Sequence, residues 1–490
     1  MWLQTIVIIL PRVQEHYNLS NKWIGTLSSS LFAGMTFGAF FWGSFSDSKG
    51  RKIPYTMTLV ITSIFGLLST FTFDFTSLCF MLFFLGFGVG GNMPTDGALY
   101  LEFLPKEYHY LLTFMSVFFS FGAVLASIIG YLILPKWSCP EIANSADPCD
   151  MNTENKGWRI MLFTVSMVTI VMLFLRSVWL KLPETPKFLM SQDRHHETII
   201  VLQDIAKING GHVQIDKNEL SLDKRDISDN QQQQSVEDGG DFMDSSTSVY
   251  DDDDYEDDED IIVHHVLLPN GELDAEEILI EEQKEGKGQI FRLLLGPQWR
   301  LTTILIWCIW TFTSVSFTMF NVFLPKYLET FGFKGEATVP TRKQVYRDYM
   351  IYSLAGVPGS VIASWLIETK LGRKGTMSTA AFGSSLSLFL FSIINSRITM
   401  VLSSSTFSFL ETLLYAVIYG YTPEVFDTNV RGTAVGTASA LGRIAGIASP
   451  IITGILLTIS TSLPLYISAI GFFIVGSCVV LLPVETRRKE

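Results

Sequence analysis

Two short polar turns, each flanked by long apolar runs, decide the fold. Residues 43–52 read Gly-Ser-Phe-Ser-Asp-Ser-Lys-Gly-Arg-Lys, and residues 368–374 read Glu-Thr-Lys-Leu-Gly-Arg-Lys. Glycine lets two helices turn tightly, while the acid and the bases can bind neighbouring helix ends in one conformation and release them in another. The simpler alternative is that the Lys and Arg residues of these turns only anchor the loops at the membrane surface. The repeat indicates a chain built from two similar halves.

The apolar runs around these turns are long enough to cross a membrane. Of the 490 residues, 48% are hydrophobic and 17% are charged, whereas a soluble domain has roughly 25% charged residues. A bilayer core of about 30 Å needs about 20 apolar residues in a helix. The stretches that reach this length are 24–46, 53–72, 78–101, 111–134, 159–180, 301–324, 349–367, 375–394, 399–422, 433–457 and 464–482. The sequence therefore predicts an all-α polytopic membrane protein with two six-helix bundles.

The first span is incomplete, because the apolar run of residues 1–10 covers only about 15 Å. We expect Pro11 to begin the next loop, so that the helix would start inside the bilayer with unpaired N–H groups. This predicts a truncated gene model or an alternative start. The alternative is a natural short form whose start is shielded by neighbouring helices.

The negative charge is concentrated in one polar segment between the two halves. The net charge is −13, and thirteen acids without a base lie between residues 237 and 260. The rest of the chain is neutral and offers no basic patch, so nucleic acid is not an expected partner. Residues 194–209 have the apolar spacing of an amphipathic helix, whereas the acidic tract 226–262 is too polar to order. It is either a solvated linker or a site for Ca²⁺ or a basic partner.

The expected organisation has four parts, all on one chain of a monomer. These are an N-terminal bundle (1–181), a linker (182–299), a C-terminal bundle (300–484) and a tail (485–490). Clusters of Lys and Arg follow the second and the eighth spans and end the chain, which places these loops and the termini of the full-length form in the cytoplasm. We expect the plasma membrane or a vacuolar or vesicular membrane. Asn18 begins a glycosylation sequon in a loop on the other side.

Two of the five cysteines lie outside the apolar runs. Cys139 and Cys149 share a polar segment on the predicted external side, where the environment is oxidising. We therefore expect a disulfide between them that closes a short ring. Neither a metal site nor a cofactor is expected, because the spacing fits no zinc framework and no Walker-type motif is present to supply phosphate chemistry. The sequence thus does not predict an enzyme.

With these motifs in place, the chain resembles a major facilitator superfamily transporter of the sugar-porter type. It is closest to the branch with synaptic vesicle glycoprotein-like and organic-ion transporters, which has many fungal members. Further matching motifs begin at Pro183 (Pro-Glu-Thr-Pro-Lys-Phe-Leu), at Tyr421 (Tyr-Thr-Pro-Glu-Val-Phe) and at Pro483 (Pro-Val-Glu-Thr). The resemblance implies two bundles that rock about a central site and give alternating access. The fifth and seventh spans lack the amide pairs of hexose transporters, so a hexose is disfavoured.

The resemblance also implies a set of gating residues at the cytoplasmic ends of the helices. We expect ion-pair clusters there that link the two bundles when the protein faces outward. The predicted members are Gly43, Asp47, Gly50, Arg51, Glu102, Glu184, Gly372, Arg373, Glu424 and Arg431.

Charged residues inside the spans mark a second candidate site, because such charges are costly and usually functional. Glu411 and Arg443 both fall about halfway along their spans and could pair directly. The pair would be either a structural ion pair or part of a substrate or proton site. Asp96 is either a cation or proton site or a satisfied buried acid. The candidate set comprises Asn92, Asp96, Phe118, Asn321, Glu411 and Arg443.

The expected function is transport of a small organic, ionic solute across the lipid bilayer by alternating access, as a secondary active or facilitative carrier. H⁺ or Na⁺ is the candidate coupling ion. The alternative is a transporter-fold receptor or vesicle component that does not transport and that acts through its acidic loop.

Overall fold

The structure of the chain is a computed structural model. It describes residues 1–103, 116–139, 149–151, 154–179, 182–192, 194–210, 294–330, 341–393, 396–426 and 428–485. The chain divides into two units. The transmembrane unit comprises Met1–Phe188 and Ile290–Glu490, and the second unit is Leu189–Gln289.

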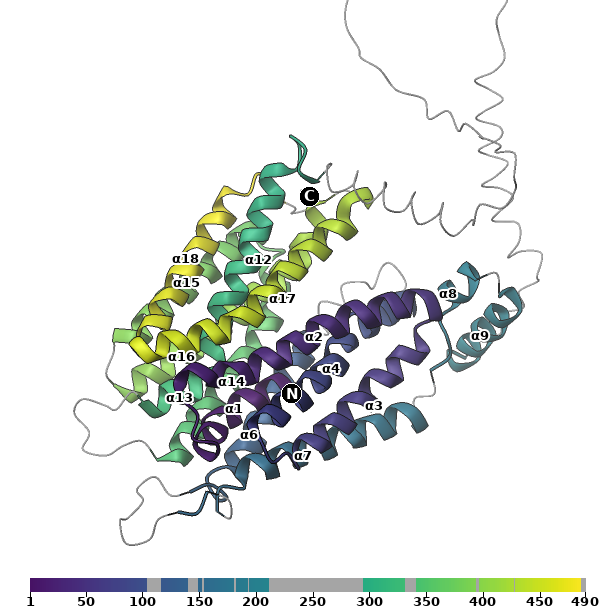
Figure 1. Ribbon diagram of the computed structural model, residues 1–490. Coiled ribbons are helices and arrows are strands. Elements are labelled where there is room, and N and C mark those ends of the chain that lie inside the picture. The colour runs from purple at the N-terminus through teal and green to yellow at the C-terminus, as the bar shows by residue number, and fades with distance from the viewer. Residues whose placement is uncertain are drawn as a thin grey trace, which may run out of the picture. The chain divides into compact units, whose positions relative to one another are not determined.

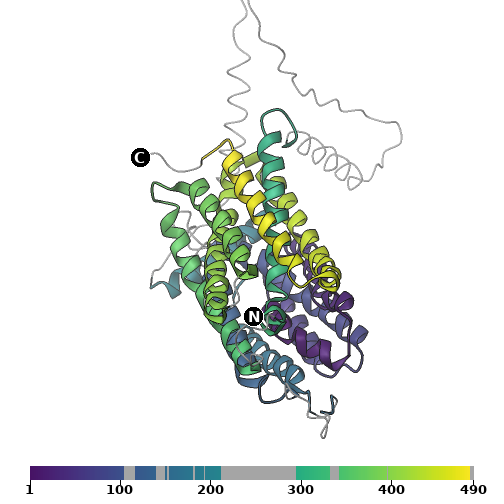
Figure 2. The same ribbon diagram turned by 90° about the vertical axis from the view of Figure 1, so that its left-hand side faces the viewer.

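The N-terminal half of the transmembrane unit consists of apolar helices, which appear in purple to teal in Figures 1 and 2. They are α1 (Trp2–His16), α2 (Asn21–Lys49), α3 (Lys52–Ser69), α4 (Phe75–Phe103), α6 (Ser116–Ile133) and α7 (Gly157–Phe174). The π-helical turn η2 (Leu175–Trp179) continues α7, and the short helix α8 (Pro186–Ser191) follows.

The C-terminal half repeats this plan in green to yellow (Figures 1 and 2). Its helices are α12 (Arg300–Asn321), α13 (Leu324–Thr330), α14 (Arg342–Leu366), α15 (Gly372–Ile393), α16 (Arg397–Val425), α17 (Thr428–Ile459) and α18 (Leu463–Leu481). Where the structure describes them, the predicted spans therefore form helices, apart from a few residues at their ends such as 70–72 and 322–323.

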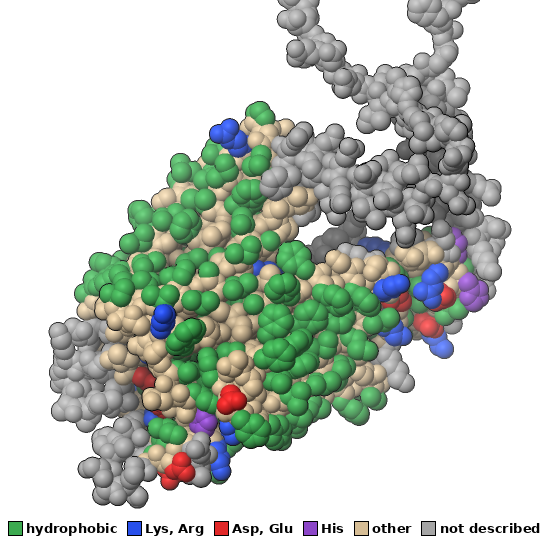
Figure 3. Space-filling view, in the orientation of Figure 1, with side chains coloured by type: hydrophobic (Ala, Val, Ile, Leu, Met, Phe, Trp, Pro, Cys, Tyr) green, Lys and Arg blue, Asp and Glu red, His purple; other side chains and the backbone are tan. Residues whose placement is uncertain are grey.

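The transmembrane unit has the surface of an integral, multi-pass membrane protein. Ten of its described helices are long and apolar enough to cross a membrane. Large apolar side chains stay exposed along them, and hydrophobic side chains, in green, are spread over much of the transmembrane unit in Figure 3. A lipid core has no water to bond a backbone, so helices satisfy the N–H and C=O groups internally. The predicted all-α class is confirmed.

The first helix differs from the prediction at Pro11. We expected a loop to begin there, but α1 continues through Pro11 to His16. The turn after the proline is anchored because Arg12 is 1% exposed and binds Glu329 of α13. A proline in a helix removes one backbone hydrogen bond, and this side-chain contact offsets that loss.

The two halves of the transmembrane unit meet along α2 and α17. Gly25 on α2 lies so close to the carbonyl of Pro450 on α17 that a Cβ atom would not fit. The contact continues to Arg443, whose guanidinium donates to the Met35 carbonyl at 3.3 Å. Beyond that level, α2 and α17 separate in Figure 1, and a Cβ atom at Gly436 would have no described neighbour within 4 Å.

The separation defines two ends of the transmembrane unit. The motif end holds Gly50 and Gly372, where the halves are apart. The disulfide end holds Cys139, Cys149 and α13, where the halves are joined by the contacts described below.

Within the second unit, the described part contains the helix α9 (His195–Ile208). It coincides with the predicted amphipathic helix at 194–209. The acidic tract 226–262 lies outside the described residues, and the predicted division into two bundles, linker and tail stays a prediction.

Candidate functional site

At the motif end, the first polar turn is held by a carboxylate from a distant segment. The backbone N–H groups of Arg51 and Lys52 donate to the two oxygens of Glu184, at 2.8 and 3.2 Å. These N–H groups begin α3 and have no partner within the helix, and a negative charge also favours the helix dipole. Gly50 has φ +98°, and a Cβ atom there would collide with the Glu184 carboxylate. The turn therefore needs glycine.

The second polar turn is held in the same way by a different acid. The N–H groups of Arg373 and Lys374 donate to the two oxygens of Glu485, at 3.0 and 3.1 Å. Gly372 has φ +66°, and a Cβ atom there would lie 3.1 Å from the same carboxylate. The Tyr421 hydroxyl donates to the Val484 carbonyl at 2.6 Å, which fixes the segment that carries Glu485.

Each described contact of the predicted gating residues lies within one half. The Arg51 guanidinium donates to Ser46 at 2.9 Å. Arg373 binds Glu424 through Nε at 2.5 Å. The side chains of Asp47, Glu102 and Arg431 lie outside the described residues. The clusters that were expected to link the bundles in an outward-facing state therefore stay a prediction. Gly43 has no described atom within 4 Å of its Cβ position.

At the disulfide end, charged side chains join the two halves directly. Arg12 on α1 binds Glu329 on α13, and it also lies 3.0 Å from Glu15. Glu15 in turn lies 3.4 Å from Arg342, which begins α14. Partly buried charge pairs are screened less than exposed ones, so this network stabilises contact between the halves at this end.

Lys326 on α13 adds a polar contact to the same network. Its ammonium donates to Gln14 of α1 at 2.6 Å and to Asn21 of α2 at 2.5 Å. Burial lowers the pKa of Lys326 to about 8, although the Glu329 carboxylate opposes this effect. Burial also raises the pKa of the Glu329 carboxyl, which Arg12 opposes. Both groups are therefore held in a site that disfavours their charge.

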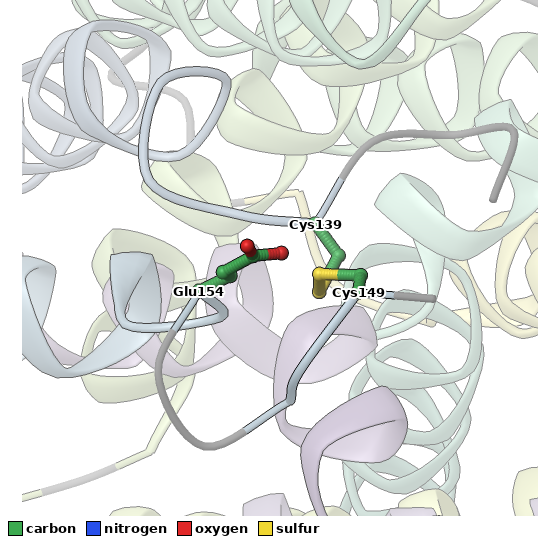
Figure 4. Close-up of side chains that lie close together, drawn as sticks. All are labelled: Cys139, Cys149 and Glu154. Atoms are coloured by element: carbon green, nitrogen blue, oxygen red, sulfur yellow. A yellow bond between two sulfur atoms is a disulfide. The ribbon is translucent and has the colours of Figure 1, made fainter. Parts of the chain in front are cut away.

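The predicted disulfide forms at this end. Cys139 and Cys149 are bonded with a Cα–Cα distance of 5.8 Å. Figure 4 shows the Glu154 carboxylate beside them, and the three side chains together resemble a metal-ligand cluster. Metals bind the thiolate, and both sulfurs are engaged in the disulfide, so the cluster does not fit a metal.

A cavity of about 330 Å³ lies between the halves near the middle of the transmembrane unit. Its wall is formed by α1, α2, α6, α12, α16 and α17 and is largely apolar. Arg443 is the only charged side chain among the described lining residues. Its aromatic lining residues are Phe32, Phe119, Trp310, Phe317, Tyr415 and Tyr419.

A polar cluster closes the cavity toward the disulfide end. Asn321 lines the cavity, as predicted for a site residue, and its oxygen accepts from Tyr352 at 3.1 Å. The same oxygen accepts from Gln4 of α1 at 3.4 Å, and Gln4 also donates to Tyr349. This cluster connects the two halves without a charge.

The predicted ion pair between Glu411 and Arg443 is wrong. Arg443 is coupled electrostatically to Tyr419 and donates to Met35 in the other half. Tyr419 lies eight residues after Glu411 on α16, which is about 12 Å along the helix axis. The prediction assumed that Glu411 and Arg443 lie at the same depth in the membrane, because each is halfway along its predicted span. In the structure, α16 and α17 extend beyond the predicted spans by different lengths, so the two residues do not lie at the same depth.

The other candidate residues lie outside the cavity. Asp96 binds Arg176 of η2, so it is a satisfied acid. Asn92 accepts from Thr58 at 2.6 Å between α3 and α4. Phe118 is 65% exposed, whereas its neighbour Phe119 lines the cavity. Asn18 is exposed in the turn between α1 and α2, where its glycosylation stays a prediction.

Several residues of these contacts were missed by the sequence reasoning. Glu485 could have been found, because Pro483-Val-Glu-Thr repeats the Pro183-Glu-Thr segment that carries Glu184. Gln4 is a lone amide in an apolar run, which is a usable signal. Glu329 gave no signal, because its partner Arg12 is distant in sequence.

The comparisons with known proteins agree with this architecture. The sequence profile of the Major Facilitator Superfamily matches residues 2–345 and 349–490, so the chain belongs to this family. It is 32% identical over 471 residues to an uncharacterized MFS-type transporter of Schizosaccharomyces pombe, which covers 95% of this chain and 77% of that protein. It is 26% identical to organic cation/carnitine transporter 7 of Arabidopsis thaliana, with 100% and 89% of the two chains covered.

Among solved structures, the chain is similar in fold to the xylose transporter XylE from E. coli in a partially occluded inward open conformation. The TM-score is 0.66 at 16% identity, and the match covers 100% of this chain and 95% of that chain. The predicted family is confirmed, and the chain is a membrane solute transporter rather than an enzyme. The alternative of a transporter-fold receptor is not favoured.

Proposed function

We propose that this transporter carries small organic anions with an apolar body by alternating access through the central cavity. The observation that carries the proposal is the Arg443 guanidinium, which is the only charged side chain among the described cavity residues. It uses one bond to the Met35 carbonyl, and a guanidinium has five N–H donors that suit a carboxylate. The aromatic walls provide apolar surface for the rest of the solute.

The separated motif end supports the direction of access. Lys49 ends α2 and Arg51 and Lys52 come directly after it, and the corresponding bases Lys370, Arg373 and Lys374 follow α14. By the positive-inside rule this end faces the cytoplasm, so the conformation described here opens the cavity inward. The charge network at the disulfide end closes the opposite side. Closure of the motif end and opening of the disulfide end would complete the cycle.

Uptake by reconstituted liposomes tests the sign of the solute charge. Benzoate and phenyltrimethylammonium have the same ring and opposite charges, so they form a matched pair of probes. We expect uptake of radiolabelled benzoate and none of the cation. Arg443→Gln should weaken benzoate transport about tenfold or more, since a charge-assisted hydrogen bond contributes about 1.5–3 kcal/mol. Arg443→Lys should retain part of it.

The exposed Arg347 provides a matched control, because Arg347→Gln removes a guanidinium that does not line the cavity. Uptake of the cation in place of benzoate would contradict the proposed class and would favour the activity that the Arabidopsis relative's name describes. If neither benzoate nor phenyltrimethylammonium were taken up, the proposed solute class would also be contradicted.

A further inference from the structure

Glu411 is a buried acid in the middle of α16. It is 6% exposed, and about 21 Å of helix lies on either side of it within Arg397–Val425. A charged side chain at the centre of a bilayer costs at least about 2.5–3.5 kcal/mol. The carboxyl group therefore needs either a positive partner or a proton.

Among the described residues, no positively charged side chain binds Glu411. Glu411 forms no ion pair with any residue that the structure describes, and Arg443 binds Met35 about two helical turns away. The adjacent Thr412 hydroxyl has a single proton, which it donates to the Ser408 carbonyl at 2.8 Å. A carboxyl group in this position holds a proton in the conformation described here.

The titratable groups around Glu411 are two tyrosines. Tyr415 lies one helical turn after Glu411 on α16. Tyr352 lies one turn before Gly356 on α14, where α14 packs so closely on α16 that a Cβ atom at Gly356 would be 3.0 Å from the hydroxyls of Ser408 and Thr412. Among the described residues of α12, α15 and α17, no charged or titratable side chain forms an ion pair or a hydrogen bond with Glu411. Tyr415 also lines the cavity, so the cavity comes within one helical turn of Glu411 along α16.

Tyr352 connects Glu411 to the contact between the halves. Its hydroxyl donates to Asn321 at 3.1 Å, and Asn321 accepts from Gln4 of the N-terminal half. A hydroxyl has one proton and can donate to one acceptor at a time. An ionised carboxylate is the stronger acceptor, so it competes with Asn321 for this hydroxyl.

We propose that Glu411 is the proton-binding site that couples this transporter to H⁺, acting through Tyr352 on the contact between the halves. With the proton bound, Tyr352 holds Asn321 and the disulfide end stays closed, as described here. When the proton leaves to cavity water, the carboxylate takes the Tyr352 hydroxyl, and the link through Asn321 to Gln4 weakens. The motif end then closes. This inference rests on the proposed transport cycle and names H⁺ rather than Na⁺ as its ion.

Infrared difference spectroscopy on the reconstituted protein tests the proton site without a solute. We expect a carbonyl band of a protonated carboxyl group in wild-type protein that disappears as the pH is raised. Glu411→Gln should remove this band, while Glu197→Gln, at an exposed residue paired with Arg194, should leave it intact. The same band in the Glu411→Gln protein would overturn the assignment.

Spin-label distances across the motif end test the coupling. Labels at Ser48→Cys and Lys370→Cys, in a background without the three free cysteines, should come closer as the pH rises. Glu411→Gln should keep the long distance at every pH. Tyr352→Phe should keep the infrared band but lose the pH response, which separates the relay from the proton site.

Two outcomes would overturn the coupling: a pH response that survives in both variants, or one that requires Na⁺. Neither readout uses a solute. Absence of benzoate uptake with an intact pH response would therefore contradict the proposed solute class and leave the proton site standing.

Discussion

The two ends of the transmembrane unit use their charged residues differently. At the motif end, Glu184 and Glu485 each bind the start of a helix in their own half. At the disulfide end, Arg12 and Glu329 join one half to the other. The described contacts at the first end make each half rigid, whereas those at the second end fix the angle between the halves.

This difference suggests how a rocking movement is controlled. Carboxylates that cap helices within one half can remain in place while that half rotates. Ion pairs between the halves must break before the disulfide end opens. Mutations at the motif end should therefore change the stability of each half, whereas mutations at the disulfide end should change the balance between conformations.

The largest effect is expected for Glu329→Gln at the disulfide end. Arg12 is almost fully buried and would lose one of its carboxylates. Breaking a buried pair costs about 3–5 kcal/mol, and we expect about 3 kcal/mol here because Glu15 remains. The variant should populate conformations with an open disulfide end, as measured by spin-label distances across that end. Glu154→Gln, at an exposed acid of the same end, should leave the distances unchanged. Equal spin-label distances in Glu329→Gln and Glu154→Gln would show that the charge network does not hold the disulfide end closed.

The next largest effect concerns the disulfide, which lies wholly within the N-terminal half. Cys139→Ser with Cys149→Ser removes a link across ten residues, and short loops of this kind contribute about 2–3 kcal/mol. The melting temperature should fall, while the spin-label distances between the halves stay the same. Cys308→Ser, at a free thiol in α12, is the control. A shift in distances would show that the disulfide also takes part in gating.

A smaller and paired effect is expected at the motif end. Glu184→Ala and Glu485→Ala each remove a carboxylate that binds two N–H groups of a helix start. Loss of such a cap costs about 1 kcal/mol. Both variants should melt at a lower temperature by a similar amount, with no change in conformational balance. Unequal losses would show that the two turns are not equivalent.

The last effect is confined to alkaline pH and concerns Lys326. Its pKa is about 8 in the closed end, whereas a solvated lysine titrates near about 10.4. An opened end therefore binds more protons between these values, so closure becomes more favourable as the pH rises from about 8 to about 10. Below about 8 the effect vanishes. In a Glu411→Gln background, which removes the opposing pH response proposed for that carboxyl group, spin-label distances across the disulfide end should show this slope, and adding Lys326→Met should remove it. The exposed Lys343→Met should retain it, and a wild-type slope in Lys326→Met would assign the dependence to another group.

Local sequence was sufficient for the elements that depend on local chemistry. The spans follow from apolar length, since a lipid environment leaves the backbone no choice but a helix. The polar turns were found from their repeated Gly-Arg-Lys pattern, and in the structure Gly50 and Gly372 adopt positive φ values that glycine tolerates best. The disulfide followed from two cysteines in one short polar segment.

Pairing between distant helices could not be read in this way. The expected contact of Glu411 with Arg443 assumed that both residues sit at the level given by their position in the span. The true level depends on how far each helix extends and how the two are packed, and this places Arg443 beside Tyr419 and Met35. Phe118 was selected over Phe119 for a similar reason, because the rotation of α6 about its axis decides which side chain reaches the cavity.

By itself, the sequence determined that this chain is a helical membrane transporter with two related halves, a disulfide and two glycine turns. These properties depend on hydrophobic length and on backbone preferences within a few residues. Only the tertiary structure decided which charges join the halves, which acid caps each turn and which buried carboxyl group has no charged partner among the described residues. Those properties depend on distances of a few ångströms between residues hundreds of positions apart, such as Arg12 and Glu329, and no local pattern encodes them.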